Sequence, residues 1–175
     1  KAGFVSSFDE SPDSLTREVA FKSAIERFGA SVDDVDVLKA DWTSGGGASA
    51  MRQRLALGAP LPEAFACAND QMAVGVIYAL GDQGLSVPGD IAVTGFDDIT
   101  FSRYFNPPLT TIRQSGNLLG EIAVNTLVAS LDGTEHVAPS VVLPTHLVVR
   151  RSCGCGQDGV PLTTPEDFLR ARGGN

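Results

Sequence analysis

Short apolar runs alternate with stretches of helical periodicity over the first hundred residues of the chain. Four of these runs are bounded by polar or turn residues and predict strands: 2–5, 35–38, 64–68 and 91–93. The stretches between them space apolar side chains three and four residues apart and predict helices: 12–28, 48–57 and 70–84. Strands that alternate with helices are typical of a parallel sheet covered by helices and joined by right-handed crossovers.

The pattern changes after residue 100. Residues 110–113 predict an extended segment, and an amphipathic helix follows over about 117–131. Two strand-like runs come next, separated by Pro144, which favours an edge or crossover strand: 141–143 and 147–149. From Ser152 onward the chain is rich in glycine and polar residues, which predicts a mobile tail.

Polar side chains stand where each of the four predicted strands ends. In open sheets of this type, ligands bind in the crevice beyond the carboxyl ends of the strands. The residues expected at that edge are Ser6, Ser7, Asp41, Trp42, Asn69, Asp70, Asp97 and Asp98. Together they predict a polar pocket floor with one flat aromatic wall.

Composition narrows the class of protein. The 175 residues fit one compact domain, and 43% of them are hydrophobic. A net charge of −8 argues against binding to DNA or to an anionic membrane by the chain alone. No apolar run approaches the roughly 20 residues of a membrane span. Three cysteines make no disulfide framework, which favours a reducing compartment, so we expect a cytoplasmic protein.

The sequence shows no catalytic constellation. The glycines of 45–47 lack the lysine of a phosphate loop and predict a flexible surface loop instead. Cys153, Cys155 and His146 fall short of a four-ligand metal site, so a tail thiol pair is the simpler interpretation. Asp97 and Asp98 point to opposite sides of an extended chain and make a poor acid–base couple. We therefore expect neither an enzyme nor a cofactor.

Four segments, in fixed order, resemble the effector-binding core of the LacI/GalR family of transcription regulators. Residues 65–75 resemble the family pattern F-x-x-A-N-D-x-M-A-x-G, and residues 84–98 resemble G-L-x-V-P-x-D-I-x-V-x-G-F-D-D. Residues 107–114 are similar to P-P-L-T-T-I-x-Q, and 143–152 to the closing strand of the family. The resemblance covers about residues 2–152.

The resemblance implies an α/β, parallel-sheet, periplasmic-binding-protein-like (type I) fold with a ligand between two subdomains. The effector-binding domain is expected over 1–152, with 1–108 and 140–152 in the C-terminal subdomain. The segment 109–139 is expected to hold the crossover and a helix of the N-terminal subdomain, and 153–175 a flexible tail. The family's helix-turn-helix head and most of its N-terminal subdomain have no counterpart in this sequence. The helix over 117–131 is therefore expected to expose an apolar patch, or to make a non-native contact with another chain.

The resemblance also assigns roles to two residues of the strand-end set. Asp97 matches a carboxylate that accepts hydrogen bonds from ligand hydroxyls, although an aspartate here also suits a turn or a helix cap. Asn69 matches an amide that faces the ligand, although asparagine is equally a helix N-cap, and both roles can coexist.

Four further residues complete the expected site. Arg17 matches an arginine that reaches into the cleft, the alternative being a solvated helix charge. Trp42 matches an aromatic that stacks on the ligand, the alternative being a core side chain. Gln114 matches a crossover residue near the cleft, and Ser7 lies at the end of the first strand.

The resemblance implies a sensing domain of a LacI-type repressor, in which a small molecule, a sugar or a derivative, selects between closure states. It implies a homodimer through the helix that begins at Asp70, operator DNA bound only through the missing head, and no membrane. A sugar-binding protein of a transport system shares the fold and is the alternative. A Rossmann-type enzyme lacks its phosphate loop here.

Overall fold

The computed structural model describes residues 1–9, 11–132 and 140–155. The strands are β1 (Ala2–Ser7), β2 (Asp36–Ala40), β3 (Ala64–Cys67), β4 (Ala92–Asp97), β5 (Thr110–Arg113) and β6 (His146–Val148). The helices are α1 (Pro12–Arg27), α2 (Ser44–Ala56), α3 (Asp70–Gly81) and α4 (Gly116–Leu131). Two short 3₁₀ helices are η1 (Val32–Asp34) and η2 (Thr100–Arg103).

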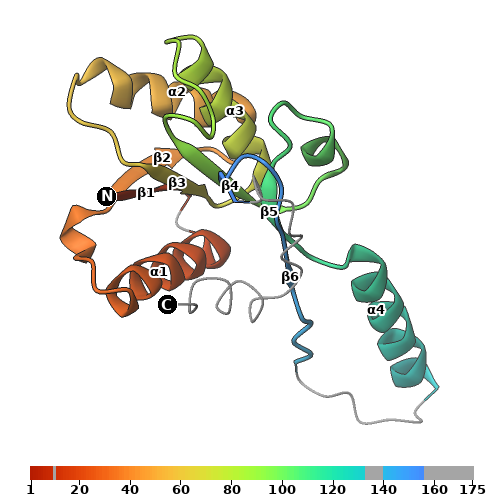
Figure 1. Ribbon diagram of the computed structural model, residues 1–175. Helices are drawn as coiled ribbons and strands as arrows, with labels where there is room; N and C mark the ends of the chain where they lie inside the picture. Colours follow the sequence, from red (N-terminus) through yellow and green to blue (C-terminus); the bar gives the residue numbers. More distant parts are fainter. Residues whose placement is uncertain (10, 133–139, 156–175) are drawn as a thin grey trace, which may run out of the picture.

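The strands form one six-stranded sheet in the order β2-β1-β3-β4-β5-β6. All neighbours are parallel except β5 and β6, which are antiparallel. Helix α1 covers one face of the sheet, and α2 and α3 cover the other (Figure 1). The predicted α/β fold with a mostly parallel sheet is confirmed, and β6 is the predicted edge strand. No helix in the described part of the chain combines the length and apolar character that a membrane crossing requires.

Glycines let helices α2 and α3 touch backbone to backbone. A Cβ atom at Gly75 would overlap the carbonyl oxygen of Ser44, and one at Gly47 would overlap that of Met72. The prediction of a flexible loop over 45–47 is therefore wrong, because these glycines form the first turns of α2. Thr43 starts the helix early, since its hydroxyl accepts the backbone N–H of Gly46 at 3.0 Å.

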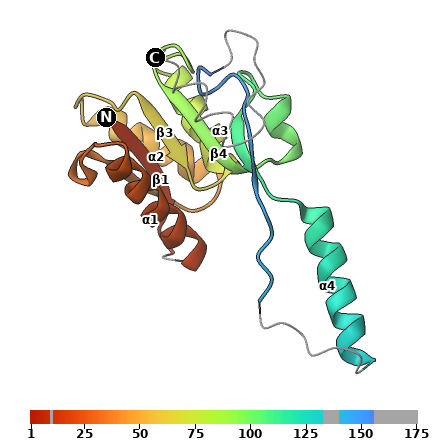
Figure 2. The same cartoon turned by 60° about the horizontal axis from the view of Figure 1, so that its bottom comes forward.

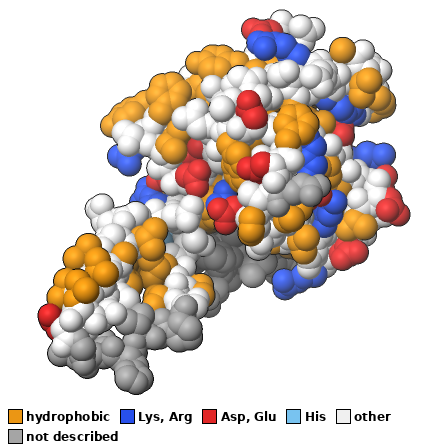
Figure 3. Space-filling model, turned by 180° about the vertical axis from the view of Figure 1, so that it is seen from behind, with side chains coloured by type: hydrophobic (Ala, Val, Ile, Leu, Met, Phe, Trp, Pro, Cys, Tyr) orange, Lys and Arg blue, Asp and Glu red, His pale blue; other side chains and the backbone are white. Residues whose placement is uncertain are grey.

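The sheet with α1, α2 and α3 forms a body, from which residues 114–132 and 140–145 project as an arm. Helix α4 makes up most of the arm and stands away from the sheet (Figure 2). Its burial pattern contains no buried residue, and its exposed apolar side chains gather on the projecting part of the molecule (Figure 3): Leu118, Leu119, Val124, Leu127, Val128 and Leu131. The predicted apolar patch is confirmed.

The end of the described chain differs from the prediction. Ser152 is fully buried, because its hydroxyl donates to the carbonyl of Val93 at 2.6 Å and accepts from Thr110 N–H at 2.8 Å. The prediction of a mobile tail from Ser152 is therefore wrong at its first residue, while 156–175 lie outside the described residues. The predicted strand over 141–143 does not form, and β6 begins only at His146.

Candidate ligand-binding site

Side chains from α1 and from the ends of β2, β4 and β5 gather at the carboxyl edge of the sheet. Arg17 comes from α1, Trp42 follows β2, Asp97 ends β4 and Gln114 follows β5. Contacts between them, described below, show that these four predicted residues form one cluster. Asn69 lies beside them, at the end of β3.

Arg17 is stacked rather than solvated. Its guanidinium carbon lies 3.9 Å from the centroid of the Phe96 ring and 5.7 Å from that of Trp42. Its Nη1 donates to the carbonyl of Ala68 at 2.6 Å. Two aromatic faces and a backbone acceptor therefore fix a planar set of donors at the strand ends. Phe96 was not among the predicted site residues.

Asp97 carries the carboxylate of the cluster. Its Oδ1 accepts a hydrogen bond from Nε2 of Gln114 at 2.9 Å. Partial burial raises the pKa of Asp97, and the negative charge of Asp13 adds to this, while Gln114 and Arg17 act in the opposite direction. Asp97 has a φ of 111°, a conformation that few residues other than glycine adopt.

Trp42 is oriented by a carboxylate that sequence reasoning missed. Its indole Nε1 donates to Oδ2 of Asp9 at 2.8 Å, and its backbone φ is 69°. This hydrogen bond is the largest cause that lowers the pKa of Asp9, to about 2, so Asp9 is ionised near neutral pH. An acidic residue two positions beyond the first strand was the only sequence signal for this contact.

Asn69 caps helix α3 and also holds the backbone of Trp42. Its Oδ1 accepts the N–H of Met72 at 2.8 Å, which confirms the predicted N-cap of α3. Its Nδ2 donates to the carbonyl of Trp42 at 2.9 Å. Ser7 is only 1% exposed and lies beneath the surface of the site, where its hydroxyl accepts from Asp9 N–H at 3.4 Å.

Asp98 faces two arginines instead of joining Asp97. Its Oδ2 accepts from Nε of Arg113 and its Oδ1 from Nη2 of Arg150, both at 2.6 Å. Burial raises the pKa of the Asp98 carboxyl, but the hydrogen bonds and charges of Arg150 and Arg113 outweigh it and hold this pKa below its ordinary value. The sequence placed Asp98 at the strand end but gave no sign of these partners.

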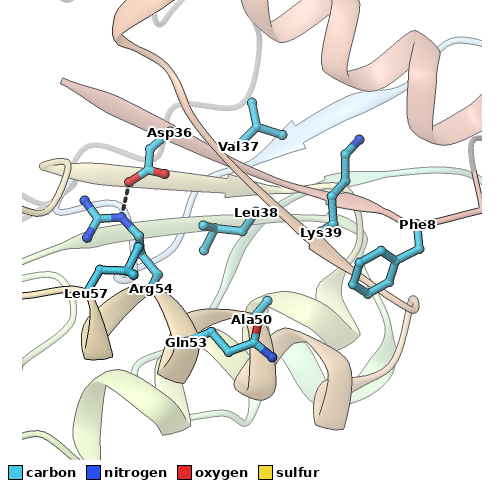
Figure 4. Close-up of a pocket in the computed structure, with 9 residues that line it drawn as sticks. All are labelled: Phe8, Asp36, Val37, Leu38, Lys39, Ala50, Gln53, Arg54 and Leu57. Atoms are coloured by element: carbon cyan, nitrogen blue, oxygen red, sulfur yellow. Dashed lines mark hydrogen bonds and ion pairs between the residues drawn. The ribbon is translucent and has the colours of Figure 1, made fainter. Parts of the chain in front are cut away.

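A cavity of about 410 Å³ lies elsewhere, between β2 and α2 at the edge of the sheet (Figure 4). Its two cationic side chains are already paired: Arg54 with Asp36, and Lys39 with Glu18 at 3.0 Å. Arg54 also donates to the carbonyls of Ala59 and Pro60. The cavity runs along the edge strand β2 and not at the carboxyl ends of the central strands, where ligands bind in open sheets, so the cluster around Asp97 is the stronger candidate for a ligand.

A doubly covered α/β sheet with an arginine, an aromatic face and a carboxylate at the strand ends defines a class of small-molecule-binding domains. The model of the periplasmic binding protein-like domain matches residues 1–153. The chain is 43% identical to the ribose operon repressor of Escherichia coli (strain K12) over 121 residues, which are 69% of this chain and 36% of that protein.

Two solved structures extend the likeness. The dimeric Lac repressor with an 11-residue C-terminal deletion superimposes with a TM-score of 0.80 at 31% identity, over 87% of this chain and 54% of that one. The complex of the transcriptional regulator CelR with cellobiose gives a TM-score of 0.77 at 29% identity, over 86% and 46%. The chain thus spans between about a third and a half of these relatives. It belongs to the periplasmic-binding-protein-like domain family and is a LacI-family effector-binding domain.

Proposed function

We propose that this chain forms one wall of the effector site of a LacI-type transcription regulator, and that a neutral sugar binds at Arg17, Trp42 and Asp97. The observation that carries the proposal is the cluster itself: a fixed guanidinium, an indole and a half-buried carboxylate within one strand-end edge. The relatives support it, because one is a ribose operon repressor and one was solved with cellobiose.

The chemistry of these groups suits a polyhydroxyl ligand. A carboxylate accepts from two neighbouring hydroxyls, an arginine donates to ring or hydroxyl oxygens, and an indole packs on the apolar face of a sugar ring. Asn69 and Gln114 supply amide groups at the border of the cluster, and Ser7 supports the loop that carries Asp9.

The local charge favours an uncharged ligand over a phosphorylated one. Asp9 and Asp97 lie in the cluster, and Asp13 is close enough to raise the pKa of Asp97, whereas Arg17 is the cation that contacts both aromatic rings. A phosphate would bring about two further negative charges to this surface.

In this proposal the arm belongs to a second subdomain, as 109–139 does in the expected domain division, and a sugar bridges the two. Closure around the sugar would change the affinity of the complete regulator for operator DNA, because one closure state binds the sugar better. The complete regulator would act in the cytoplasm as a homodimer. Support comes from the Lac repressor, solved as a dimer, and from Tyr78 on α3, whose side chain is exposed.

A transport protein is not favoured, because the curated relative and both structural neighbours named above are repressors or transcriptional regulators. These relatives are likewise not described as enzymes.

Calorimetric titration of the intact protein with D-ribose, lactose and cellobiose tests the proposal. We expect one sugar to bind, and Asp97→Asn to weaken its binding about 100-fold through loss of a charged acceptor. Asp82→Asn is the matched control, because it removes an exposed aspartate paired with Arg52 and should leave the affinity unchanged. Equal affinity of the Asp97→Asn and wild-type proteins would contradict the proposed site.

A further inference from the structure

The arm is connected to the body by two neighbouring strands. β5 ends at Arg113, where the arm begins, and β6 starts at His146, where the arm ends. The two strands pair with each other, so that Ile112 lies opposite Leu147. Any rotation of the arm relative to the body must therefore pass through this pair (Figure 2).

Asp98 binds both of these connections with one carboxylate. Arg113 is the last residue of β5, and Arg150 follows β6 by two residues. Each arginine donates to a different oxygen of Asp98 at 2.6 Å. The Asp98 side chain is 3% exposed, so the two bonds are shielded from water on the side of the acceptor. Arg150 also donates to the carbonyl of Leu109 at 2.7 Å, which ties it to the start of β5.

The backbone N–H of Asp98 supports the unusual conformation that presents Asp97. Asp97 and Asp98 have φ values of 111° and 53°, and such conformations persist only where the surroundings over-determine them. The N–H of Asp98 donates to Oγ1 of Thr111 at 3.3 Å, and that hydroxyl in turn donates to Oδ1 of Asp70 at 2.5 Å. Asp98 is therefore fixed through its backbone to the core and through its side chain to Arg113 and Arg150, on the two connections that carry the arm.

A second path runs in parallel through Gln114. This residue follows Arg113 directly and donates to Asp97 at 2.9 Å. A ligand hydroxyl that binds Asp97 must share this carboxylate with the first residue of the arm. The consecutive residues Asp97 and Asp98 thus bind the consecutive residues Gln114 and Arg113 on the β5 connection, and Arg150 adds the β6 connection.

We propose that Asp98 is the positioning residue that couples the ligand-facing carboxylate of Asp97 to both strands that carry the arm. The inference rests on the proposed function, in which the arm belongs to the second wall of the cleft. A sugar at Asp97 shifts the Asp97–Asp98 backbone, and the bridge from Asp98 to Arg113 and Arg150 passes that shift to β5 and β6 together. The arm then moves as one unit instead of following either strand alone.

Hydrogen exchange of the intact protein, read by mass spectrometry, tests the bridge without a ligand. Asp98→Asn keeps the shape of the side chain and removes its charge, so amide exchange in β5 and β6 should become about tenfold faster. Exchange in β1 should not change. A loss of global stability would instead speed β1 as well, and that result, like unchanged exchange in β5 and β6, would overturn the proposal.

Arg113→Gln provides a second variant that is expected to fold, because the Arg113 side chain is 47% exposed. It should reproduce the faster exchange in β5 and β6, and Arg113→Lys should restore most of the wild-type protection by keeping the charge. Asp82→Asn, which breaks an exposed pair with Arg52, is the control for charge removal and should leave exchange unchanged.

The coupling is measured as the change in hydrogen exchange when the sugar is added. The sugar is the one that calorimetry identifies, at a concentration that saturates each variant. The sugar should slow exchange in β6 about tenfold in the wild type and less than twofold in Asp98→Asn. Equal slowing in both proteins would overturn the proposal. Failure of every sugar to bind the wild type would contradict the proposed function, and it would also remove the ligand that this coupling requires. The ligand-free exchange would still decide whether the bridge exists.

Discussion

Helices α3 and α4 are both rich in apolar residues, yet the protein treats them in opposite ways. Nine residues of α3 are buried, against α2 and the sheet, whereas none of α4 is. Apolar periodicity therefore indicates that a helix has a face suited to burial. It does not show whether another element of the structure buries that face. In the proposed regulator, the rest of the second subdomain would bury the apolar face of α4.

The difference in packing between α3 and α4 is clearest at one glycine of each helix. We expect the largest change in the free energy of unfolding at the glycine of α3. Gly75→Ala places a Cβ against the carbonyl oxygen of Ser44, with no flexible side chain that can give way. It should lower the free energy of unfolding by about 3 kcal/mol or more. Gly120→Ala in α4 meets nothing within 4 Å, so it should raise stability by about 0.5–1 kcal/mol through helix propensity.

Urea unfolding of both variants, followed by circular dichroism, measures these changes. Equal effects at Gly75 and Gly120 would show that the body is no more tightly packed than the arm, and would break the comparison.

The body also holds a buried carboxylate, and its removal gives the next largest effect. Asp70 accepts hydrogen bonds from Ser102 Oγ at 2.6 Å, Thr111 Oγ1 at 2.5 Å and Ile99 N–H at 3.0 Å. Asp70→Ala leaves these three donors without their acceptor, two of them on buried side chains, and should cost about 3 kcal/mol of unfolding free energy. Asp70→Asn keeps an acceptor for two of them and should cost about 1 kcal/mol. Thermal unfolding measures both, and an equal loss would contradict the account of the hydrogen bonds.

A third effect depends on pH and lies at the contact of α1 with β2. Burial raises the pKa of Glu18, but hydrogen bonds from Lys22, Lys39 and Ser6 outweigh it and lower the pKa from 4.5 to about 2. Because the pKa is lower in the folded state, the stabilisation is present above pH 4.5 and is lost as pH falls toward 2.

Glu18→Gln should therefore be less stable than the wild type by about 2 kcal/mol at pH 6, and the difference should disappear near pH 2. Urea unfolding at a series of pH values measures it. A difference that stays constant with pH would mean that the glutamate acts through packing and not through its charge.

Much of the body followed from the order of apolar runs. The order of strands and helices and the Asn69 cap are local properties of the sequence, and all of them are confirmed. The start of α2 was missed because glycines at 45–47 are poor helix formers in isolation. What keeps them helical is contact with α3, which no local pattern shows.

In the candidate site, too, local signals were predictable from the sequence and tertiary contacts were not. The strand-end rule predicted Trp42 and Asp97, and the family resemblance added Arg17 and Gln114. The structure brings the four together, although whether they bind a ligand stays a prediction. Asp9 and Phe96 were missed because their partners, Trp42 and Arg17, lie 33 and 79 positions away in the chain. Such pairs form only when the sheet is assembled. Their identity is not encoded in any short segment.

Ser152 has a consequence for the order in which the protein is made. Its hydroxyl accepts the N–H of Thr110, and Val93 N–H donates to its backbone carbonyl at 2.8 Å. Both bonds join strands that are synthesised 40 to 60 residues earlier. The first five strands can pair while the chain is still on the ribosome, β4 with β5 included, but the N–H groups of Val93 and Thr110 find these partners only when Ser152 has emerged. In a nascent chain stalled before this residue, these two amides should therefore exchange faster than in the complete protein.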